Sequence, residues 1–539
     1  MKFYKIIIAT AAMLIANSCS QDFLDTKPLT EKNDLSYYTT PDEAQEALVG
    51  CYDGLQQNYA DVFSLPVCAE VLSDLCFGGT GATDGDDFRK IDEYDKELGI
   101  GYTNIFNNTW KNSYKTIFRC NMLISRIDQV DWQSNTQLAK DIEAEARFIR
   151  AFTYFDMVRM FERIPLLSEP SSENIPQSEP DETYTLIAED LLFAVNNISA
   201  KAYNNIGSTD YGHVTKWAAE ALLARVYLFY TGYYGKDDLL GLVSKSQALA
   251  YVEDIIANSG HGLVNNFYDL WPAAAQYQAV ENGKTIDDNT YAGEDNNEVV
   301  YSIKYTYTGY ADGNHWIIMN GMRLTTWAAR GYDTGWGANT VLSEFYNSFD
   351  PKDDRRSASI IAIEEESIVF SPVQAKEYTG YYNKKYTPLC TADGVSLAVS
   401  LGAESNQSGQ NQDYIVVRYA DVLLMAAELG SSNALTYVNM VRERAKVDPV
   451  TAVTKDVIFE ERKFELAFEG LRYWDLLRYD NTLAYAAEKV SYNGIVLNGA
   501  AEVPKVVSGA KLIETRGLFQ IPNEQITLSD GVLKQNPGW

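Results

Sequence analysis

Apolar residues recur at helical spacing in two parts of the chain, residues 40–260 and 413–539, and lose that spacing between them. The first helix shows the pattern, because Thr40 can cap its N-terminus, Pro41 suits its first turn and Glu43 stands at the capping-box position. The same periodicity predicts further helices at Trp110–Ile127, Ile142–Phe161, Asp181–Val195, Val214–Tyr230 and Ser246–Asn258. Helix pairs with small-residue faces predict a mainly α fold built as a tetratricopeptide-like array.

Residues 261–412 have a different character. Gly, Asn, Asp, Tyr and Trp dominate this stretch, and only Glu298–Tyr307 alternates like a strand, so minor β structure is expected. Long irregular segments inside a regular protein are usually functional or disordered, and the aromatic content argues against disorder. We therefore predict an irregular, loop-rich functional region at residues 261–412.

Helical periodicity returns after residue 413. Val417–Leu429 and Ala434–Arg444 predict a helical hairpin, and Asp456–Tyr479 predicts one long amphipathic helix. Opposite charges stand three residues apart on that helix, as the pairs Arg462/Glu465, Glu469/Arg472 and Arg472/Asp475. A helix-stabilising role is favoured for them over a catalytic carboxylate group. Trp271 and Trp474 stand in apolar runs and are predicted to lie in the core.

Residues 1–18 have the layout of a bacterial secretory signal peptide, because Lys2 and Lys5 precede the apolar run Ile6–Ala16. This run is too short to span a hydrocarbon core, which takes roughly 20 residues. A small residue directly before Cys19 favours a lipoprotein signal that leaves Cys19 lipidated, followed by a polar tether at residues 19–39. The alternative is an ordinary signal peptide with a chance cysteine.

The chain is strongly acidic, with 45 Lys and Arg against 74 Asp and Glu and a net charge of −29 over 539 residues. This charge argues against binding to nucleic acid or to an anionic membrane surface, since both need a basic face. The three histidines and six cysteines lack the short spacings of a zinc site. An exported protein can form disulfides, of which Cys68–Cys76 is one candidate, with buried free thiols as the alternative. The sequence leaves this choice open for Cys51, Cys68, Cys76, Cys120 and Cys390.

Aromatic side chains are abundant, with 37 Tyr, 21 Phe and 9 Trp. In an exported acidic protein this content is typical of a sugar-binding surface, because ring faces stack on the C–H faces of pyranoses. The segment His315–Gly337 concentrates such rings among Gly, Asn and Arg. Its candidate ligand-binding residues are Trp316, Trp327, Tyr332 and Trp336 as stacking rings, and Arg330 and Asp333 as partners of sugar hydroxyls. The alternative for each ring is a place in the core.

The glycine-rich loop Phe77–Asp87 is a second candidate. It lacks the GK[ST] sequence of a phosphate-binding P-loop. Its aspartates could bond to sugar hydroxyls or hold a structural Ca²⁺, although no complete calcium-loop spacing is present, and a solvated loop is the alternative. Phe77 and Asp86 are retained as candidate ligand-binding residues, and no other cofactor is expected.

Several segments, in order and at fitting spacing, together resemble the SusD/RagB family. They are Cys19–Asp25, Thr40–Ala44, Gly50–Tyr52, Ala144–Ala151, Arg163–Leu166, Arg418–Met425, Val438–Ala445, Glu460–Leu476 and Gln535–Trp539. The resemblance implies four tetratricopeptide-like helix pairs, contributed by residues 40–260 and 413–539, with residues 261–412 as the ligand-binding region. The loop Phe77–Asp87 lies where the family places part of its binding face.

The resemblance also implies a function. Members are outer-membrane lipoproteins of Bacteroidetes-type bacteria that bind glycans or peptides without catalysis and deliver them to a SusC-like TonB-dependent transporter. We therefore expect a surface-exposed protein anchored in the outer membrane through Cys19, with a glycan ligand for nutrient uptake. An exported glycoside hydrolase is one alternative, because 74 acids make a catalytic carboxylate pair impossible to exclude by counting. A structural surface protein or adhesin is the other.

Overall fold

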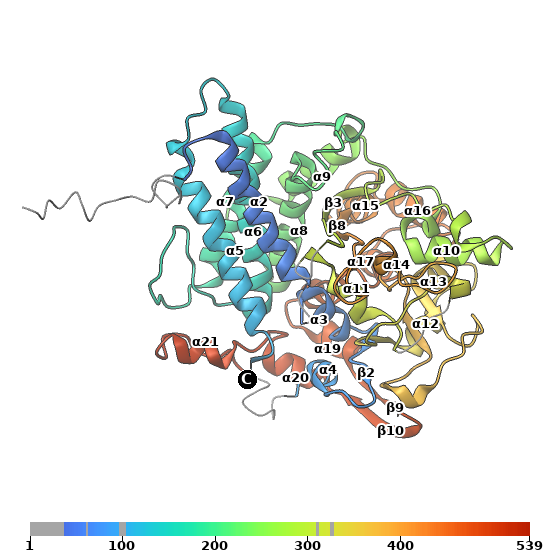
Figure 1. Ribbon diagram of the computed structural model, residues 1–539. Coiled ribbons are helices and arrows are strands. Elements are labelled where there is room, and N and C mark those ends of the chain that lie inside the picture. The colour runs from blue at the N-terminus through green and yellow to red at the C-terminus, as the bar shows by residue number, and fades with distance from the viewer. Residues whose placement is uncertain (1–36, 61–62, 96–103, 309–311, 324–327) are drawn as a thin grey trace, which may run out of the picture.

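The computed structural model describes residues 37–60, 63–95, 104–308, 312–323 and 328–539 (Figure 1). Its N-terminal part is a row of long helices in which each packs against the next along the chain. These helices are α2 (Pro41–Ala60), α5 (Asn107–Arg126), α6 (Thr136–Phe161), α7 (Pro180–Asn197), α8 (Lys216–Tyr234) and α9 (Lys245–Asn258). The mainly helical fold predicted from the sequence is thereby confirmed.

Polar caps explain where several of these helices begin. At α2 the Glu43 amide donates to Thr40 Oγ1 over 3.3 Å, and Glu43 Oε2 accepts from the Thr40 amide over 3.2 Å, which is the expected capping box. Helix α7 begins one residue before the predicted start, because Glu179 and not Asp181 forms its capping box.

The C-terminal helices continue this array. The predicted hairpin is present as α15 (Tyr419–Glu428) and α16 (Ala434–Arg444), and α15 also packs against α9. The remaining helices are α17 (Lys455–Glu465), α18 (Arg472–Tyr479), α19 (Ala484–Val490), α20 (Gly509–Thr515) and α21 (Asn523–Leu528). Because α18 packs against α8, the two ends of the chain build one helical body (Figure 1).

The prediction of one helix over Asp456–Tyr479 is wrong. Helix α17 ends at Glu465, and α18 begins only at Arg472. Between them Phe468 and Gly470 have φ angles of 64° and 72°. A Cβ on Gly470 would lie 2.7 Å from Tyr414 Oη, so the break places the chain directly against a strand of the core.

The charged residues of this segment also have partners other than those predicted. Glu465 is buried among Arg418 (2.5 Å), Arg355 (3.2 Å) and Arg444, and Arg472 bonds to Asp74 over 2.7 Å. These ion pairs join α17 and α18 to distant elements, whereas the predicted pairs lay within one helix. Their role is structural. Each buried charge has a partner of opposite sign, and an unpaired buried charge would destabilise the folded state.

Residues 261–412 contain only short elements, as the loss of periodicity indicated. The helices are α10 (Pro272–Glu281), α11 (His315–Asn320), α12 (Ser343–Ser348), α13 (Asp354–Ser359) and α14 (Leu397–Ser400). The strands are β3 (Val299–Ile303), β4 (Thr340–Val341), β5 (Ile360–Ala362), β6 (Ala375–Lys376) and β7 (Tyr381–Asn383). The strand predicted at Glu298–Tyr307 is thus present, but shorter, and it pairs antiparallel with β8 (Tyr414–Arg418).

Small sheets tie this region to both ends of the chain. One sheet has the strand order β1-β4-β7-β5, where β1 is Cys76–Phe77. Strand β2 (Thr80–Gly81) pairs with β6. Strands β9 (Tyr492–Asn498) and β10 (Ala501–Val507) form a hairpin at the lower edge of the molecule in Figure 1.

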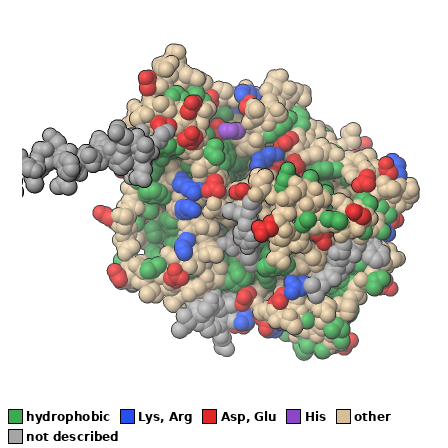
Figure 2. All heavy atoms as spheres, in the orientation of Figure 1, with side chains coloured by type: hydrophobic (Ala, Val, Ile, Leu, Met, Phe, Trp, Pro, Cys, Tyr) green, Lys and Arg blue, Asp and Glu red, His purple; other side chains and the backbone are tan. Residues whose placement is uncertain are grey.

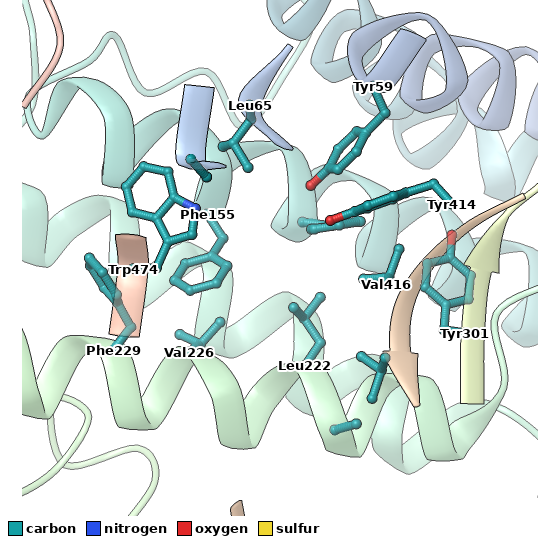
Figure 3. Close-up of a cluster of buried hydrophobic side chains, with 14 of the residues drawn as sticks. Tyr59, Leu65, Phe155, Leu222, Val226, Phe229, Tyr301, Tyr414, Val416 and Trp474 are labelled. Atoms are coloured by element: carbon teal, nitrogen blue, oxygen red, sulfur yellow. The ribbon is translucent and has the colours of Figure 1, made fainter. Parts of the chain in front are cut away.

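The main core lies where α2, α6, α8, α18 and the β3–β8 pair meet (Figure 3). Tyr59 and Tyr414 approach to 5.0 Å between ring centroids, and Trp474 packs near Phe229. Trp271 and Trp474 are both buried, which confirms their predicted place in the core. Within the described part of the chain, Cys51, Cys68, Cys76, Cys120 and Cys390 are all buried free thiols, so the pair Cys68–Cys76 is not formed.

Candidate functional site

The two segments in which the sequence predicts ligand-binding residues, Phe77–Asp87 and His315–Gly337, lie against each other in the structure. Strand β1 pairs antiparallel with β4, with Phe77 opposite Thr340, so the loop Phe77–Asp87 lies against the end of His315–Gly337. The loop then pairs through Thr80 and Gly81 with β6. We call this meeting place of the loop, the His315–Gly337 segment and β6 the junction.

Glycine allows the backbones at the junction to approach closely. A Cβ on Gly79 would lie 2.5 Å from the carbonyl oxygen of Gly337, and a Cβ on Gly81 would lie 2.6 Å from Arg323 Nε. Both distances are too short for any larger residue unless the Gly337 backbone and the loop move apart at Gly79, or the Arg323 side chain moves at Gly81. Gly79 and Gly81 therefore allow close packing of this loop.

Two ion pairs line the junction. Arg323 Nη2 lies 3.1 Å from Asp84 Oδ2, and Lys376 Nζ donates to Asp86 Oδ1 over 2.8 Å. The Lys376 hydrogen bond lowers the pKa of Asp86, so its carboxylate is ionised at neutral pH. These partly exposed pairs present fixed donors and acceptors, which is what recognition of a hydroxyl-rich ligand requires.

Trp336 is the ring of the predicted platform that is not fully buried among the described residues, and it is partly buried against the main core. Its amide donates to the Ile318 carbonyl over 2.8 Å, and the next amide, of Gly337, donates to the Gly321 carbonyl over 2.9 Å. Trp336 is therefore carried on a hydrogen-bonded backbone beside the loop. Trp327 lies outside the described residues.

Two other rings of the predicted platform, Trp316 and Tyr332, lie in the core, which was the alternative for each ring. Trp316 is fully buried and stacks on Tyr386 with ring centroids 4.2 Å apart. Tyr332 is fully buried and donates to Glu366 over 2.9 Å. A buried ring offers no face to a ligand, so Trp316 and Tyr332 are corrected to core residues.

The remaining candidate residues are either buried or paired with other side chains of the protein. Arg330 pairs with Glu281 of α10, and Asp333 is buried, where its Oδ1 accepts from the Thr334 amide over 2.7 Å. Phe77 is buried to 3% exposure, while Asp86 keeps a third of its side chain exposed. Of the predicted charged residues, Asp86 therefore contributes most directly to the junction.

Sequence reasoning missed Arg323 and Lys376. Arg323 stands inside His315–Gly337, yet no spacing rule links it to Asp84, because the two are far apart in sequence. Lys376 stands in a short strand without a recognisable pattern. Only the pairings of β1 with β4 and of β2 with β6 bring these residues together.

A hollow of about 400 Å³ lies in the helical part between α2, α6 and the segment before α8. His213 Nδ1 lies 2.8 Å from Glu145 Oε2 at its wall, and Tyr52 also donates to Glu145. The hydrogen bond to Glu145 raises the pKa of His213. Charged side chains of both signs are interspersed over the face seen in Figure 2, which shows no single charged patch.

The described residues contain neither a metal-binding cluster nor a membrane-spanning helix. No group of three or more His, Cys, Asp or Glu side chains there is placed to hold a metal ion. No helix among the same residues is long and apolar enough to cross a membrane.

The fold is that of a mainly helical scaffold protein, with loops from distant parts of the chain meeting at the junction. Two family models match the chain, one described as "SusD family" at residues 275–539 and one as "Starch-binding associating with outer membrane" at residues 22–228. Together these matches cover most of the chain, and the chain belongs to the SusD family.

Individual relatives agree with this assignment. A SusD-like protein of Bacteroides ovatus is 25% identical over 503 residues, covering 89% of this chain and 83% of its own. A solved "Laminarin binding SusD-like protein" superposes with a TM-score of 0.70 at 24% identity, covering 93% of this chain and 100% of its own. Surface glycan-binding protein A from Bacteroides thetaiotaomicron, in complex with laminarihexaose, superposes with a TM-score of 0.71 at 22% identity and the same coverage.

Proposed function

We propose that this protein binds glycan at the junction, on the outer surface of a bacterial outer membrane, and delivers it to a SusC-like TonB-dependent transporter. The observation that carries the proposal is Trp336, a partly buried ring on a hydrogen-bonded backbone, whose neighbour Gly337 packs against Arg323 of the Arg323–Asp84 pair. A ring face can stack on a pyranose while the ion-paired groups bond to its hydroxyls.

The comparisons support a glycan ligand. One matching family model is described as starch-binding, and two structural neighbours are a laminarin-binding protein and a laminarihexaose complex. SusD-like glycan-binding proteins are non-catalytic, so capture and not hydrolysis is the proposed activity. Trp327 belongs to the same proposed site on its sequence position alone, and Phe77, whose ring is buried, belongs to it as a support for the loop and not as a stacking face.

The proposed location in the outer membrane is inferred from the N-terminal signal sequence and from the family. The description of the second family model includes association with the outer membrane. Cys19, which lies outside the described residues, is the proposed lipid attachment point, and the tether at residues 19–39 connects it to α2. The transporter partner follows from the family resemblance.

Affinity electrophoresis tests the proposal. The full chain, in a detergent without a sugar headgroup, is run in native gels that contain laminarin, starch, other neutral glucans or anionic polysaccharides, and released reducing ends are assayed in parallel. We expect retardation by at least one glycan without new reducing ends. Release of reducing ends would contradict the proposal in favour of a hydrolase, and migration unaffected by every glycan would contradict glycan binding.

A further inference from the structure

A groove of about 480 Å³ lies between the β9–β10 hairpin and the start of the Phe77–Asp87 loop. Its aromatic wall consists of Phe77, Tyr378 and Tyr492, and its rim carries Glu344 and Glu502. This volume is within the range of pockets that hold small ligands. None of the ligand-binding candidates except Phe77 lines this groove.

The rings of the groove are fixed in position. Phe77 and Tyr492 meet edge to face with centroids 4.8 Å apart. Tyr492 lies over Gly494 on the same face of β9, where a Cβ would come within 2.5 Å of the Tyr492 hydroxyl oxygen. Tyr378 stacks on Phe370 at 5.2 Å, and its amide donates to Leu497 of the hairpin over 2.8 Å. The aromatic wall is therefore preorganised.

The polar ends of these rings are open to a ligand. Tyr378 and Tyr492 are half-buried, and neither hydroxyl has a hydrogen-bond partner among the residues that the structure describes. By contrast, the buried Tyr473 hydroxyl donates to the Gly517 carbonyl over 2.8 Å. A phenol that combines a free hydroxyl with a half-exposed ring face suits a sugar, which presents both C–H faces and hydroxyls.

The charge of the groove selects among sugars. Its charged lining residues are the carboxylates Glu344 and Glu502, both exposed. The ammonium group of Lys505 lies 5.5 Å from the Phe77 ring, but it is buried and bonds to Asp92 over 2.7 Å. A sulfated or uronic glycan would meet like charges here, whereas a neutral glycan would not.

The groove adjoins the junction. Phe77 lines the groove, and Gly79, two residues later, abuts Gly337 directly after Trp336. We infer that the groove is a second subsite that takes further units of a neutral polysaccharide whose chain also occupies the junction. This inference rests on the proposed function and extends it by naming the ligand's charge and the need for a long chain.

The test compares chain lengths. Dissociation constants of the full chain in a sugar-free detergent are measured for laminarin and for laminarihexaose, with Tyr492→Ala, Tyr492→Phe and the matched control Phe118→Ala. Phe118 is an exposed ring on α5, away from the groove. We expect Tyr492→Ala to weaken laminarin binding about fivefold, the loss of one ring contact, with a smaller effect on the hexasaccharide. Phe118→Ala should change neither, and Tyr492→Phe, which keeps the ring packing, isolates the hydroxyl.

The possible results separate the two proposals. Unchanged laminarin binding by Tyr492→Ala and Tyr492→Phe, with binding by the wild type intact, would overturn the groove proposal alone. No binding of any glycan by the wild type would overturn the proposed function, and the groove proposal with it. For charge, we expect sulfated laminarin to bind more weakly than laminarin, and the double variant Glu344→Gln/Glu502→Gln to narrow that difference. Equal binding of both polymers by the wild type would contradict a neutral ligand.

Discussion

Arg323 and Asp84 pair at 3.1 Å across the junction and connect two segments that are far apart in the sequence. Both side chains are partly exposed, at 19% and 37%, and exposed ion pairs stabilise a fold by less than about 1 kcal/mol. The pair therefore contributes little to the free energy of unfolding. Its role is to hold a donor group and an acceptor group in fixed positions beside Gly337, the residue after Trp336.

Gly79→Ala tests whether close backbone contact builds the junction. The new Cβ would lie 2.5 Å from the Gly337 carbonyl oxygen, so the loop must move away. We expect a loss of about 1–3 kcal/mol in the free energy of unfolding and weaker glycan retention. Gly85→Ala is the matched control in the same loop, because its nearest contact would be an ordinary 3.5 Å to Asp87. Identical melting and retention of the two variants would refute this packing role.

Glu70 makes stability depend on pH. Glu70 is fully buried, it accepts from the Gly470 amide over 2.6 Å, and burial raises its pKa to about 8. The folded state then keeps a proton that the unfolded state loses near pH 4.3, so this residue destabilises the fold increasingly as pH rises from about 4.3 to 8. Glu70→Gln removes the effect and keeps an acceptor for Gly470. Its melting temperature should gain on the wild type between pH 5 and pH 8.

The exposed substitution Glu189→Gln on α7 is the control for that series. It should follow the wild type at every pH. A constant difference between Glu70→Gln and the wild type over this pH range would show that Glu70 is ionised in both states.

His213 gives a pH dependence of stability with the same sign as that of Glu70. Its hydrogen bond to Glu145 raises the pKa of the imidazole, with Asp210 adding to the effect and Lys201 opposing it. The stabilisation is fully present below the unfolded pKa, about 6.5, and is lost as pH rises through the higher folded pKa. We expect His213→Gln to lower the melting temperature more at pH 5.5 than at pH 8.5. An equal effect at both pH values would show that protonated His213 adds nothing.

Cys19→Ala tests the proposed anchor. The variant should lose incorporation of labelled palmitate and be depleted from the outer-membrane fraction, because the lipid chains are its proposed anchor in the bilayer. A Ser20→Ala control should keep both properties. Absence of label from the wild type would favour the alternative of an ordinary signal peptide, and normal labelling of Cys19→Ala would show that the lipid is attached at another residue.

Most helices could be predicted because their apolar spacing is a local property of the sequence. The break between α17 and α18 could not, because it depends on the approach of Gly470 to Tyr414, a residue on a distant strand. The same limit applies to the ion pairs of Glu465, whose partners Arg418 and Arg355 lie far from it in the sequence.

For the candidate site too, local features could be predicted from the sequence and long-range contacts could not. Composition identified the two segments of the junction, but it could not separate Trp336 from Trp316. Trp316 is buried because Tyr386, seventy positions later, stacks on it. Loop composition also gave no sign of Arg323, whose partner Asp84 comes from another part of the chain.

The most direct test of glycan capture at the junction is the dissociation constant of Trp336→Ala for the polysaccharide that retards the wild type, measured beside Phe118→Ala. We expect about tenfold weaker binding for Trp336→Ala, which still folds although its melting temperature falls because the ring packs against the core, and wild-type binding for Phe118→Ala. Wild-type affinity in Trp336→Ala would contradict the junction as the binding site.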